Sequence, residues 1–347
     1  MLLGVYLLES SDFGIRSLEM GIRYDYIHSF IVGREPDNTI YRNTVVYKNF
    51  SGTLGLKTKL GEHTSFQSNI GTAWRAPNVA ELYRFGQHAF FLEYGLWRYT
   101  IDERFDFITT SEGILTEEDR PVPAEVGYKW INTFSINRPN FRSEITGYFN
   151  YIENYIFSKP GGITRTARGF FIFNVYDQTD AIIWGIDMHN EWQHSPAFSS
   201  IFKGSYLWSK QIKDDDPFVG QPPAQLGYTF RYQPSISFLG NTTFELAFDY
   251  TFEQFQHPRI LTVDEFLFAF QKDIVRFGDD AADFDILPPP PGYFLTNFTW
   301  SSSFKKFQWQ FQIRNLFNTS YRVYTARLRY FDDEMGRNFI LTLTYQF

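Results

Sequence analysis

The strongest constraint on the fold is a two-residue alternation of apolar and polar side chains, which is clearest at the end of the chain. Successive side chains of a β-strand point to opposite faces, so residues two apart share a face. The stretch Asn338–Phe347 therefore predicts a strand with one apolar, largely aromatic face. That face carries Phe339, Leu341, Leu343, Tyr345 and Phe347, and the mostly polar face carries Asn338, Ile340, Thr342, Thr344 and Gln346.

The same alternation recurs along the whole chain, with an unusual weight of aromatic residues. There are 39 Phe and 22 Tyr among 347 residues, and aromatics make up 20% of the chain. We count about thirteen predicted strands, most of about 9–13 residues, which is the length that crosses a bilayer at a tilt. Typical apolar faces are Leu18, Met20, Ile22, Tyr24 and Tyr26, then Leu226, Tyr228, Phe230 and Tyr232, then Phe244, Leu246, Phe248, Tyr250 and Phe252.

The connections between these predicted strands alternate between short and long. Short connections are expected near 61–62, 135–140, 193–197, 235–241 and 305–306, and long ones near 28–43, 75–123, 157–180, 210–223, 255–292 and 315–337. Outer-membrane barrels have short periplasmic turns and long outer loops. A soluble sandwich has no reason to sort its loops by side. The pattern therefore predicts an all-β fold, an antiparallel transmembrane β-barrel in the outer membrane of a Gram-negative bacterium.

Composition agrees with this prediction and excludes several other classes of protein. The sequence has no apolar run long enough for a membrane-spanning helix. Cysteine is absent, which removes disulfides and thiolate chemistry, and the net charge of -7 does not favour nucleic-acid binding. A soluble sandwich or propeller is the alternative fold, but no blade-like repeat is visible. The aromatic content would also favour aggregation in water.

The start of the chain predicts a portion of a longer barrel. Residues Met1–Glu9 lack the basic segment of a signal peptide, and Glu9 comes too early for one. Counting back from the last strand through alternating turns places Met1 at the outer side. Bacterial single-chain barrels have an even number of strands with both ends periplasmic. We therefore expect a truncated chain.

Several stretches resemble the TonB-dependent outer-membrane receptors. Residues Gly71–Tyr83 contain the Trp-Arg-Ala-Pro box followed by Glu-Leu, and Asn315–Tyr321 contains Asn-Leu-Phe-Asn followed by Tyr. Residues Gly336–Phe339 before the aromatic terminus, Glu153–Ile156 and the Gly292-Tyr293 pair also fit that family's order. The positions that match the family's motifs are Arg75, Pro77, Glu81, Asn315, Phe317, Asn318 and Phe347.

The resemblance implies a fold and a function. The family's barrel has twenty-two strands and an N-terminal plug, so residues 1–347 would be one domain, the C-terminal portion of the barrel without the plug. The complete receptor would take up a scarce nutrient such as a ferric siderophore or haem, driven by TonB through the missing plug. Alternatives are a passive porin-like channel and a non-functional receptor fragment. Outer-membrane lipid would surround the barrel, and the barrel-assembly machinery would recognise the strand ending in Phe347.

No motif predicts an enzyme, because a nucleophile elbow, a zinc motif and a P-loop are all missing. We therefore expect neither a catalytic site nor a resident cofactor, and the third alternative, an outer-membrane enzyme, has only unplaced Ser and His residues such as His189 in its favour.

Four residues are candidate contacts for a small-molecule ligand. His88 follows the Arg-Ala-Pro box, with Tyr83 nearby, and the resemblance implies that a loop histidine there can bind haem iron. The alternative is an ordinary surface histidine. Arg165 and Arg168, beside Gly161-Gly162, could contact an anionic ligand, or could simply make the loop basic.

Two acidic stretches could hold Ca²⁺ through carboxylate oxygens, namely Asp279–Asp285 and Asp214–Asp216. Neither has the glycine and spacing of a calcium-binding loop. Solvated acidic loops are the better interpretation, so no metal site is predicted.

Overall fold

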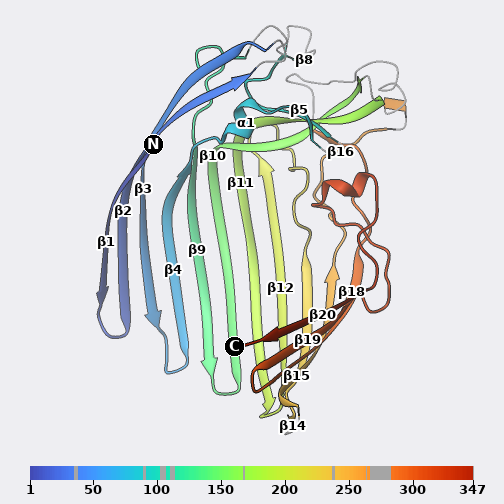
Figure 1. Ribbon diagram of the computed structural model, residues 1–347. Coiled ribbons are helices and arrows are strands. Elements are labelled where there is room, and N and C mark those ends of the chain that lie inside the picture. Colours follow the sequence, from blue (N-terminus) through green and yellow to red (C-terminus); the bar gives the residue numbers. More distant parts are fainter. Residues whose placement is uncertain are drawn as a thin grey trace.

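One continuous antiparallel sheet forms most of the chain (Figure 1). The computed structural model describes residues 1–34, 38–88, 91–101, 107–109, 114–166, 169–236, 239–262, 264–265 and 283–346. Within these residues, the sheet has sixteen strands, and thirteen of them follow one another in sequence order along the wall. They are β1 (Leu2–Asp12), β2 (Arg16–Arg34), β3 (Ile40–Lys59), β4 (Thr64–Arg75), β9 (Glu125–Arg138), β10 (Phe141–Thr166), β11 (Gly169–Ser195), β12 (Phe198–Gln211), β13 (Gln225–Tyr232), β15 (Gly240–Thr251), β18 (Tyr293–Phe304), β19 (Phe307–Arg314) and β20 (Asn338–Tyr345).

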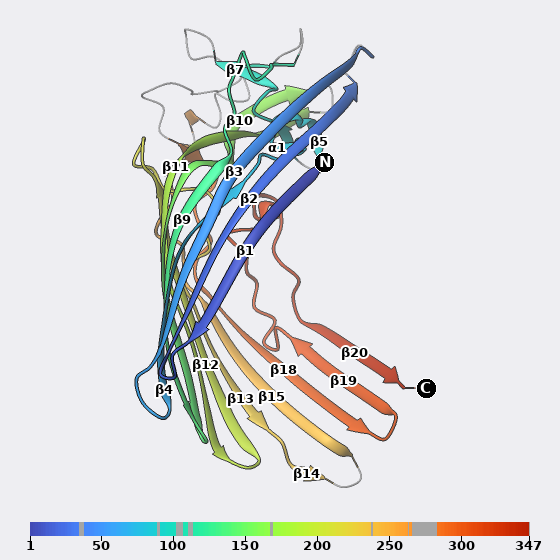
Figure 2. The same ribbon diagram turned by 90° about the vertical axis from the view of Figure 1, so that its left-hand side faces the viewer.

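The sheet curves strongly, as the wall of a barrel does (Figure 2). Strands β1 and β20 are the two ends of its strand order within the described residues. Each strand pairs with the next by antiparallel hydrogen bonds, so the ladder itself connects the wall. The prediction of an all-β antiparallel barrel portion with about thirteen strands is confirmed.

One face of the sheet is apolar and the other is polar. This follows because apolar and polar residues alternate along each strand and the strand pairing keeps residues of one kind on the same face. A row of side chains that face each other across six strands is entirely apolar: Leu54, Ile70, Trp130, Phe149, Trp184 and Trp208. A row on the other face is polar: Lys57, Gln67, Thr133, Thr146, Asp187 and Ser205. We call these the apolar face and the polar face. The apolar face stays exposed, with Ile70 58% and Trp130 52% accessible.

Aromatic pairs mark two levels of the apolar face. Close to the short turns lie the pairs Phe141–Trp192, Phe244–Trp300 and Phe307–Tyr345, with ring centroids 5.3, 6.2 and 4.9 Å apart. Farther along the strands lie Tyr24–Phe50 and Tyr128–Tyr151, with centroids 4.7 and 6.0 Å apart. Aromatic girdles at both interfaces are typical of transmembrane barrels.

The two ends of the sheet differ as the loop lengths predict. At one end, here the turn end, short connections at 13–15, 60–63, 139–140, 196–197, 233–239 and 305–306 join the strands. The other end, here the loop end, holds the described parts of the long segments 76–124, 212–224, 252–292 and 315–337. The sorting of connections by side is confirmed for these segments.

Two predicted loops are instead extended hairpins. Strands β2 and β3 have 19 and 20 residues and span most of the predicted loop at 28–43. Strands β10 and β11 have 26 and 27 residues and span most of the predicted loop at 157–180. The register shifts between Pro160 and Gly162 of β10, where Gly162 has a φ of +139°, so these turn-forming residues produce a bulge rather than a loop.

Small elements fill the loop end. They are α1 (Val79–Tyr83), β5 (Phe85–His88), β6 (Phe91–Tyr94), β7 (Tyr99–Ile101), β8 (Phe107–Thr109), β16 (Arg259–Ile260), β17 (Phe284–Asp285) and η1 (Arg327–Tyr330), whereas β14 (Ser235–Ile236) lies at the turn end. Strand β6 pairs in parallel with β11, which ties the 76–124 segment to the wall. No helix among the described residues is long and apolar enough to cross a membrane.

The buried apolar clusters are built from these loop-end segments and from the strand extensions. The largest cluster joins Ile31 and Val45 of the β2–β3 hairpin to α1, to the segment after α1 and to β10. Its other members are Leu82, Tyr83, Leu96, Trp97, Val122 and, from β10, Ile156. Others centre on Phe173 and Val175, on Phe157 and Phe218, and on Leu261, Phe284 and Ile286. The loop end is therefore packed like a water-soluble domain, while the wall is not.

Candidate functional site

The Arg-Ala-Pro box forms a charged joint at the loop end of β4. The guanidinium of Arg75 donates to both oxygens of Glu125 at 2.6 and 2.8 Å, and its Nη1 donates to both oxygens of Glu81 at 2.8 Å. Paired donors that match a carboxylate in this way hold a fixed geometry. Glu125 also accepts from the backbone N–H of Ile156 at 2.6 Å, so a single arginine connects β4, α1, β9 and β10.

Helix α1 starts at this joint through a reciprocal cap. The Asn78 side chain accepts from the backbone N–H of Glu81 at 3.0 Å, and the Glu81 carboxylate accepts from the backbone N–H of Asn78 at 2.8 Å. These bonds satisfy N–H groups that a helix start otherwise leaves unpaired. Pro77 is buried just before the cap. The motif positions Arg75, Pro77 and Glu81 thus fix where the 76–124 segment leaves the wall.

Tyr83, a predicted ligand contact, lies inside the largest buried cluster. Its ring contacts Tyr41 and Trp97 with centroids 5.5 and 5.1 Å away, and its hydroxyl accepts from Asn43 Nδ2 at 2.7 Å. Burial raises the pKa of Tyr83 to about 12, so its hydroxyl keeps its proton at neutral pH. The structure places Tyr83 between α1 and the β2–β3 hairpin, where it packs the loop end.

The other three predicted ligand contacts are described only in part. His88 ends β5, where its backbone pairs with Phe91, and Arg165 lies near the tip of β10, opposite Phe170. Their side chains, and all of Arg168, lie outside the described residues. A ligand-binding role for His88, Arg165 and Arg168 therefore stays a prediction.

The Asn-Leu-Phe-Asn motif builds the turn that ends β19. Asn315 and Asn318 adopt left-handed backbone angles, with φ of 52° and 57°. The Asn315 side chain accepts from the N–H of Thr319 and donates to its carbonyl, both at 2.8 Å, while Asn318 Oδ1 accepts from the N–H of Arg337 at 2.8 Å. Asparagine tolerates this conformation best among residues with a side chain. Phe317 is exposed, and Phe347 lies outside the described residues.

A buried ion pair joins the two last loop segments. Asp285, fully buried in β17, accepts from Arg329 Nη2 of η1, and from Tyr330 Oη at 2.6 Å. The same guanidinium lies 4.5 and 4.4 Å from the ring centroids of Tyr324 and Tyr330. Burial, and next the charge of Asp285, raises the pKa of Tyr330 above its ordinary range. Segments 252–292 and 315–337 are therefore held together by a closed polar network.

Two more charged clusters bind the remaining segments into one unit. Glu93 of β6 is paired with Arg84 on one side and with Arg327 of η1 on the other. Lys159 of β10 lies 2.8 Å from Asp177 of β11 and 2.7 Å from Asp283. Burial alone would lower the pKa of Lys159, but these two carboxylates raise it above its ordinary value.

Part of the acidic-loop prediction is wrong. Asp283 and Asp285 were expected in a solvated loop, yet both are buried and paired with cations from other segments. Asp279 and Asp280 lie outside the described residues, whereas Asp214 and Asp215 are exposed as expected. Within the described part of the chain, no cluster of His, Asp and Glu could hold a metal ion.

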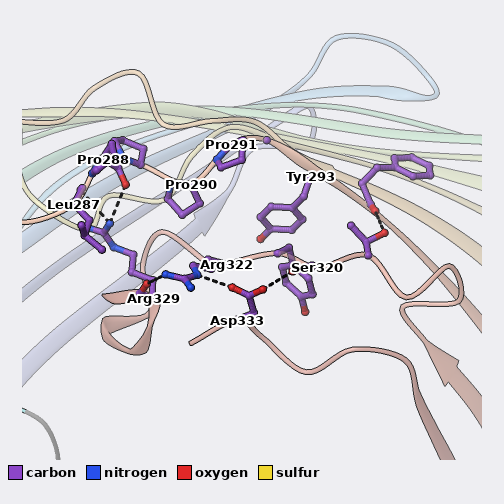
Figure 3. Close-up of a pocket in the computed structure, with 14 residues that line it drawn as sticks. Leu287, Pro288, Pro290, Pro291, Tyr293, Ser320, Arg322, Arg329 and Asp333 are labelled. Atoms are coloured by element: carbon purple, nitrogen blue, oxygen red, sulfur yellow. Dashed lines mark hydrogen bonds and ion pairs between the residues drawn. The ribbon is translucent and has the colours of Figure 1, made fainter. Parts of the chain in front are cut away.

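A cavity of about 630 Å³ lies beside the buried pair (Figure 3). One wall is the proline run 288–291, and the opposite side carries Ser320 and Arg322, which both donate to Asp333. The rings of Tyr293 and Tyr321 meet with centroids 4.6 Å apart. Among the described residues, neither phenol hydroxyl has a hydrogen-bond partner. The cavity has the size of a small-molecule site, with apolar walls and a few polar groups.

Sequence reasoning missed the residues that join the loops. Glu93 and Arg327 lie 234 positions apart in sequence, and Asp285 and Arg329 lie 44 apart, so spacing alone does not connect them. The available signal was charge: the 279–285 segment is acidic, and Arg327-Leu328-Arg329 is the basic run that complements it.

Known proteins similar to this chain are found by family and by structure. The family profile described as "TonB dependent receptor-like, beta-barrel" matches residues 3–316. No curated protein sequence matches the chain. Solved structures with a similar fold include the copper transporter OprC and, from Neisseria meningitidis, the FrpB iron transporter, F3-3 variant. A third is the ferric yersiniabactin uptake receptor FyuA from Yersinia pestis.

These structures share the fold at low sequence identity. OprC gives a TM-score of 0.72 at 14% identity, covering 100% of this chain and 48% of its own. FrpB gives a TM-score of 0.64 at 14% identity, and the match covers 99% of this chain and 45% of FrpB. FyuA gives a TM-score of 0.60 at 13% identity, and the match covers 100% of this chain and 45% of FyuA. The chain therefore spans a little under half the length of these proteins. It belongs to the TonB-dependent receptor-like β-barrel family.

Proposed function

We propose that this chain is part of an outer-membrane receptor that takes up a scarce nutrient such as a ferric siderophore or haem. The carrying observation is the contrast between its two ends: a wall with an exposed apolar face, and a loop end cross-linked by buried ion pairs. An exposed apolar face over so many strands requires lipid around it. The names of OprC, FrpB and FyuA, which refer to copper, iron and ferric yersiniabactin, support a metal or metal chelate as the cargo.

The whole of residues 1–347 acts in this proposal as one barrel portion. The plug that couples to TonB belongs to the remainder of the receptor, and the barrel-assembly machinery recognises the strand ending in Phe347. The loop end provides the ligand contacts. The cavity beside Tyr293 and Arg322 is one candidate, and His88, Tyr83, Arg165 and Arg168 are the others.

An uptake experiment tests this function. Cells grown under metal limitation, with and without the intact gene, are given radiolabelled ferric siderophore, haem or copper, and accumulation is measured in TonB-positive and TonB-negative strains. We expect gene-dependent accumulation of one cargo that disappears without TonB. Accumulation that does not need TonB would indicate a passive channel instead, and none with any cargo would contradict the proposal.

A matched variant pair links uptake to the cavity. Tyr321→Ala removes a half-buried ring from the cavity without touching the Asp285–Arg329 pair, while Phe317→Ala removes an exposed ring from the same loop segment outside the cavity. If the cavity binds cargo, only the first variant raises the concentration needed for half-maximal uptake. Equal behaviour of both would exclude the cavity and leave the uptake function standing.

A further inference from the structure

The upper part of β3 has a neighbouring strand on one side only. Strand β3 pairs with β4 from Thr53 to Lys59, whereas its pairing with β2 continues as far as Ile40. The β2–β3 hairpin extends beyond the end of β4 at the loop end (Figure 1). Within the described residues, no strand pairs with the second side of β3 over residues 42–50. This side of residues 42–50 is here called the free edge.

The direction of the backbone groups at the free edge follows from the ladder with β2. In an antiparallel pair, the N–H and C=O groups of one residue both point to the neighbouring strand, and those of the next residue both point away. The N–H of Gly52 donates to Thr72 Oγ1 of β4 at 3.0 Å, so it points away from β2. The N–H of Lys59 donates to the carbonyl of Ile15, just before β2, at 2.8 Å. Even-numbered residues of β3 therefore direct their backbone groups to the free edge.

Side chains of β3 itself cap only part of this edge. The N–H groups of Thr44 and Phe50 each donate, at 2.7 Å, to the side-chain oxygen of the asparagine that precedes them. Within the described part of the chain, the N–H groups of Val46 and Lys48 have no hydrogen-bond partner. An edge strand with open backbone groups is a template for pairing with another chain.

Packing on the inner side holds the free edge in an extended shape. Val45 is buried in the largest cluster, and Tyr47 donates its hydroxyl to the carbonyl of Val122 at 3.2 Å. Between these two residues, Val46 points to the outer side and is 49% accessible. A strand that is already fixed in its bound shape loses little conformational freedom on binding. The edge is therefore both open and preorganised.

The outer side chains of the free edge carry positive charge. Arg42 and Lys48 lie on this side near the two ends of the segment, and both are exposed. Neither forms an ion pair within the described residues. Arg34 of β2 adds a third exposed cation, because Val32 is opposite Arg42 and Arg34 is therefore a diagonal neighbour of Arg42.

These charges decide which strand fits the edge. Two copies of the chain, paired antiparallel and centred on Val45, would place Arg42 of each copy opposite Lys48 of the other. Like charges directly opposite each other are destabilising, whereas opposite charges across two strands are stabilising. A segment with carboxylates at both ends and uncharged, strand-forming residues between them matches the edge.

We propose that the free edge of β3 binds an extended acidic segment of a soluble partner protein as an added antiparallel strand. The segment lies opposite residues 42–48, with its carboxylates facing Arg42 and Lys48 and its backbone paired with the open groups of the edge. In the proposed membrane orientation the edge lies beyond the Tyr24–Phe50 pair of the aromatic girdle, so a partner reaches it from water. The edge is separate from the cavity beside Tyr293, so this binding does not depend on cargo.

A synthetic peptide and its N-methylated forms test the pairing. The probe is fluorescein-labelled Glu-Thr-Thr-Val-Thr-Thr-Glu with blocked ends, and its binding to the full chain refolded in detergent is followed by fluorescence anisotropy. In the proposed pairing, the N–H groups of its third and fifth residues point to β3, and those of its second and fourth residues point away. N-methylation of the first pair should weaken binding about tenfold, whereas N-methylation of the second pair should leave it unchanged. Any other pattern, including no binding of the parent peptide, would overturn the proposal.

Charge-reversed variants test the recognition by charge. Arg42→Glu and Lys48→Glu combined should weaken binding of the acidic peptide about tenfold, and should allow binding of the same peptide with lysine in place of both glutamates. The matched control, Lys57→Glu and Lys59→Glu combined, reverses two exposed lysines of β3 outside the free edge and should change neither affinity. Equal behaviour of the two double variants would show that the attraction is nonspecific and would overturn the proposal.

A backbone variant tests the edge itself. Val46→Pro removes an N–H that points away from β2, so the ladder with β2 is kept, whereas Val46→Thr keeps the N–H. Only the proline variant should bind the acidic peptide about tenfold more weakly, and both should take up cargo as the wild type does. Equal peptide binding by the two variants would overturn the added strand and leave the uptake function standing. Peptide binding as expected, in a chain that takes up no cargo, would overturn the uptake function alone.

Discussion

The wall and the loop end share the long strands β2, β3, β10 and β11, yet they are stabilised in different ways. In the wall, the apolar side chains point outwards and remain exposed, so neighbouring strands are held by the backbone ladder and by pairs such as Tyr128–Tyr151. At the loop end, apolar side chains such as Trp97 and Val175 are fully buried between segments. In the proposed function, lipid provides the apolar contacts of the wall, whereas the loop end provides its own.

Charges follow the same division. Ion pairs of the wall, such as Arg231–Glu245, lie on the polar face with both side chains about one-third exposed. Ion pairs of the loop end, such as Arg329–Asp285, have side chains that are 3% and 0% exposed. Exposed pairs contribute little, whereas breaking a buried pair leaves an uncompensated charge. The comparison thus predicts that the loss of a single charge destabilises the loop end, and that the gain of a single charge on the apolar face destabilises the wall.

The largest effect is expected from Arg329→Met, which leaves the Asp285 carboxylate buried without its cation. Loss of one member of a buried pair costs about 3–5 kcal/mol. We expect hydrogen exchange to accelerate in segments 252–265 and 315–337, with the wall strands unchanged. The control is Arg322→Met, whose pair with Asp333 is exposed, and it should alter exchange only slightly. Equal acceleration in β9 and β10 would show that the two regions are not separate.

The complementary change adds a charge to the wall. Leu54→Arg places a cation in the middle of the apolar face, beside Ile70, and should destabilise the chain in lipid vesicles by about 2–4 kcal/mol. Thr53→Arg, one residue away, points to the polar face between Gly21 and Gly71 and should cost little. Urea titrations followed by tryptophan fluorescence measure both. A similar loss for the two variants would contradict the assignment of the faces.

A smaller effect is expected at the junction of the two regions. Asn78→Ala removes the side-chain acceptor that caps α1, and lost caps cost about 1 kcal/mol. Hydrogen exchange in Val79–Tyr83 should increase, while β4 stays protected. Asn78→Asp keeps an acceptor and should restore protection. Failure of that variant to restore it would show that the Arg75–Glu81 ion pair, rather than the cap, holds the helix.

The wall could be predicted from sequence because its pattern is local. Alternation depends only on residue order, so the strand near Leu226 and the strand near Phe244 are both visible without any tertiary information. The pattern fails where both faces become apolar. In the part of the β2–β3 hairpin beyond Tyr26 and Lys48, Ile31 and Val32 are neighbours, as are Val45 and Val46, so the alternation is lost and the sequence predicts a loop there.

The loop end could be predicted only where a motif fixes the local backbone. The Arg-Ala-Pro box and the Asn-Leu-Phe-Asn turn use partners within a few residues or on an adjacent strand. The joints at Glu93 and Asp285 use partners from distant segments, and only the topology brings these together. In β10, Pro160 and Gly162 indicate a turn by composition, whereas the ladder continues through them as a bulge.

The smallest expected effect is a dependence of the last loop segment on pH. Hydrogen bonds from Ser320, and next from Arg322, hold the pKa of Asp333 below its ordinary value of 3.8. The folded loop therefore favours the ionised carboxylate. Its contribution is complete above the ordinary pKa and is lost as the pH falls through the lowered one. Hydrogen exchange of residues 320–333, corrected for intrinsic rates, should increase modestly below pH 4, whereas the Arg329–Asp285 pair should keep η1 protected.

The variant Asp333→Asn distinguishes the contribution of this carboxylate to the pH dependence from that of the other acidic side chains of the loop end. The amide cannot ionise, so residues 320–333 of the variant should exchange faster than those of the wild type already at neutral pH. Acid should not accelerate their exchange further. Wild type and variant should then converge at low pH, because both lack the charge that Arg322 and Ser320 bind. If the variant still loosens in acid to the same extent, the response belongs to the buried network around Asp285, and the exposed pair contributes nothing to the difference between the two regions.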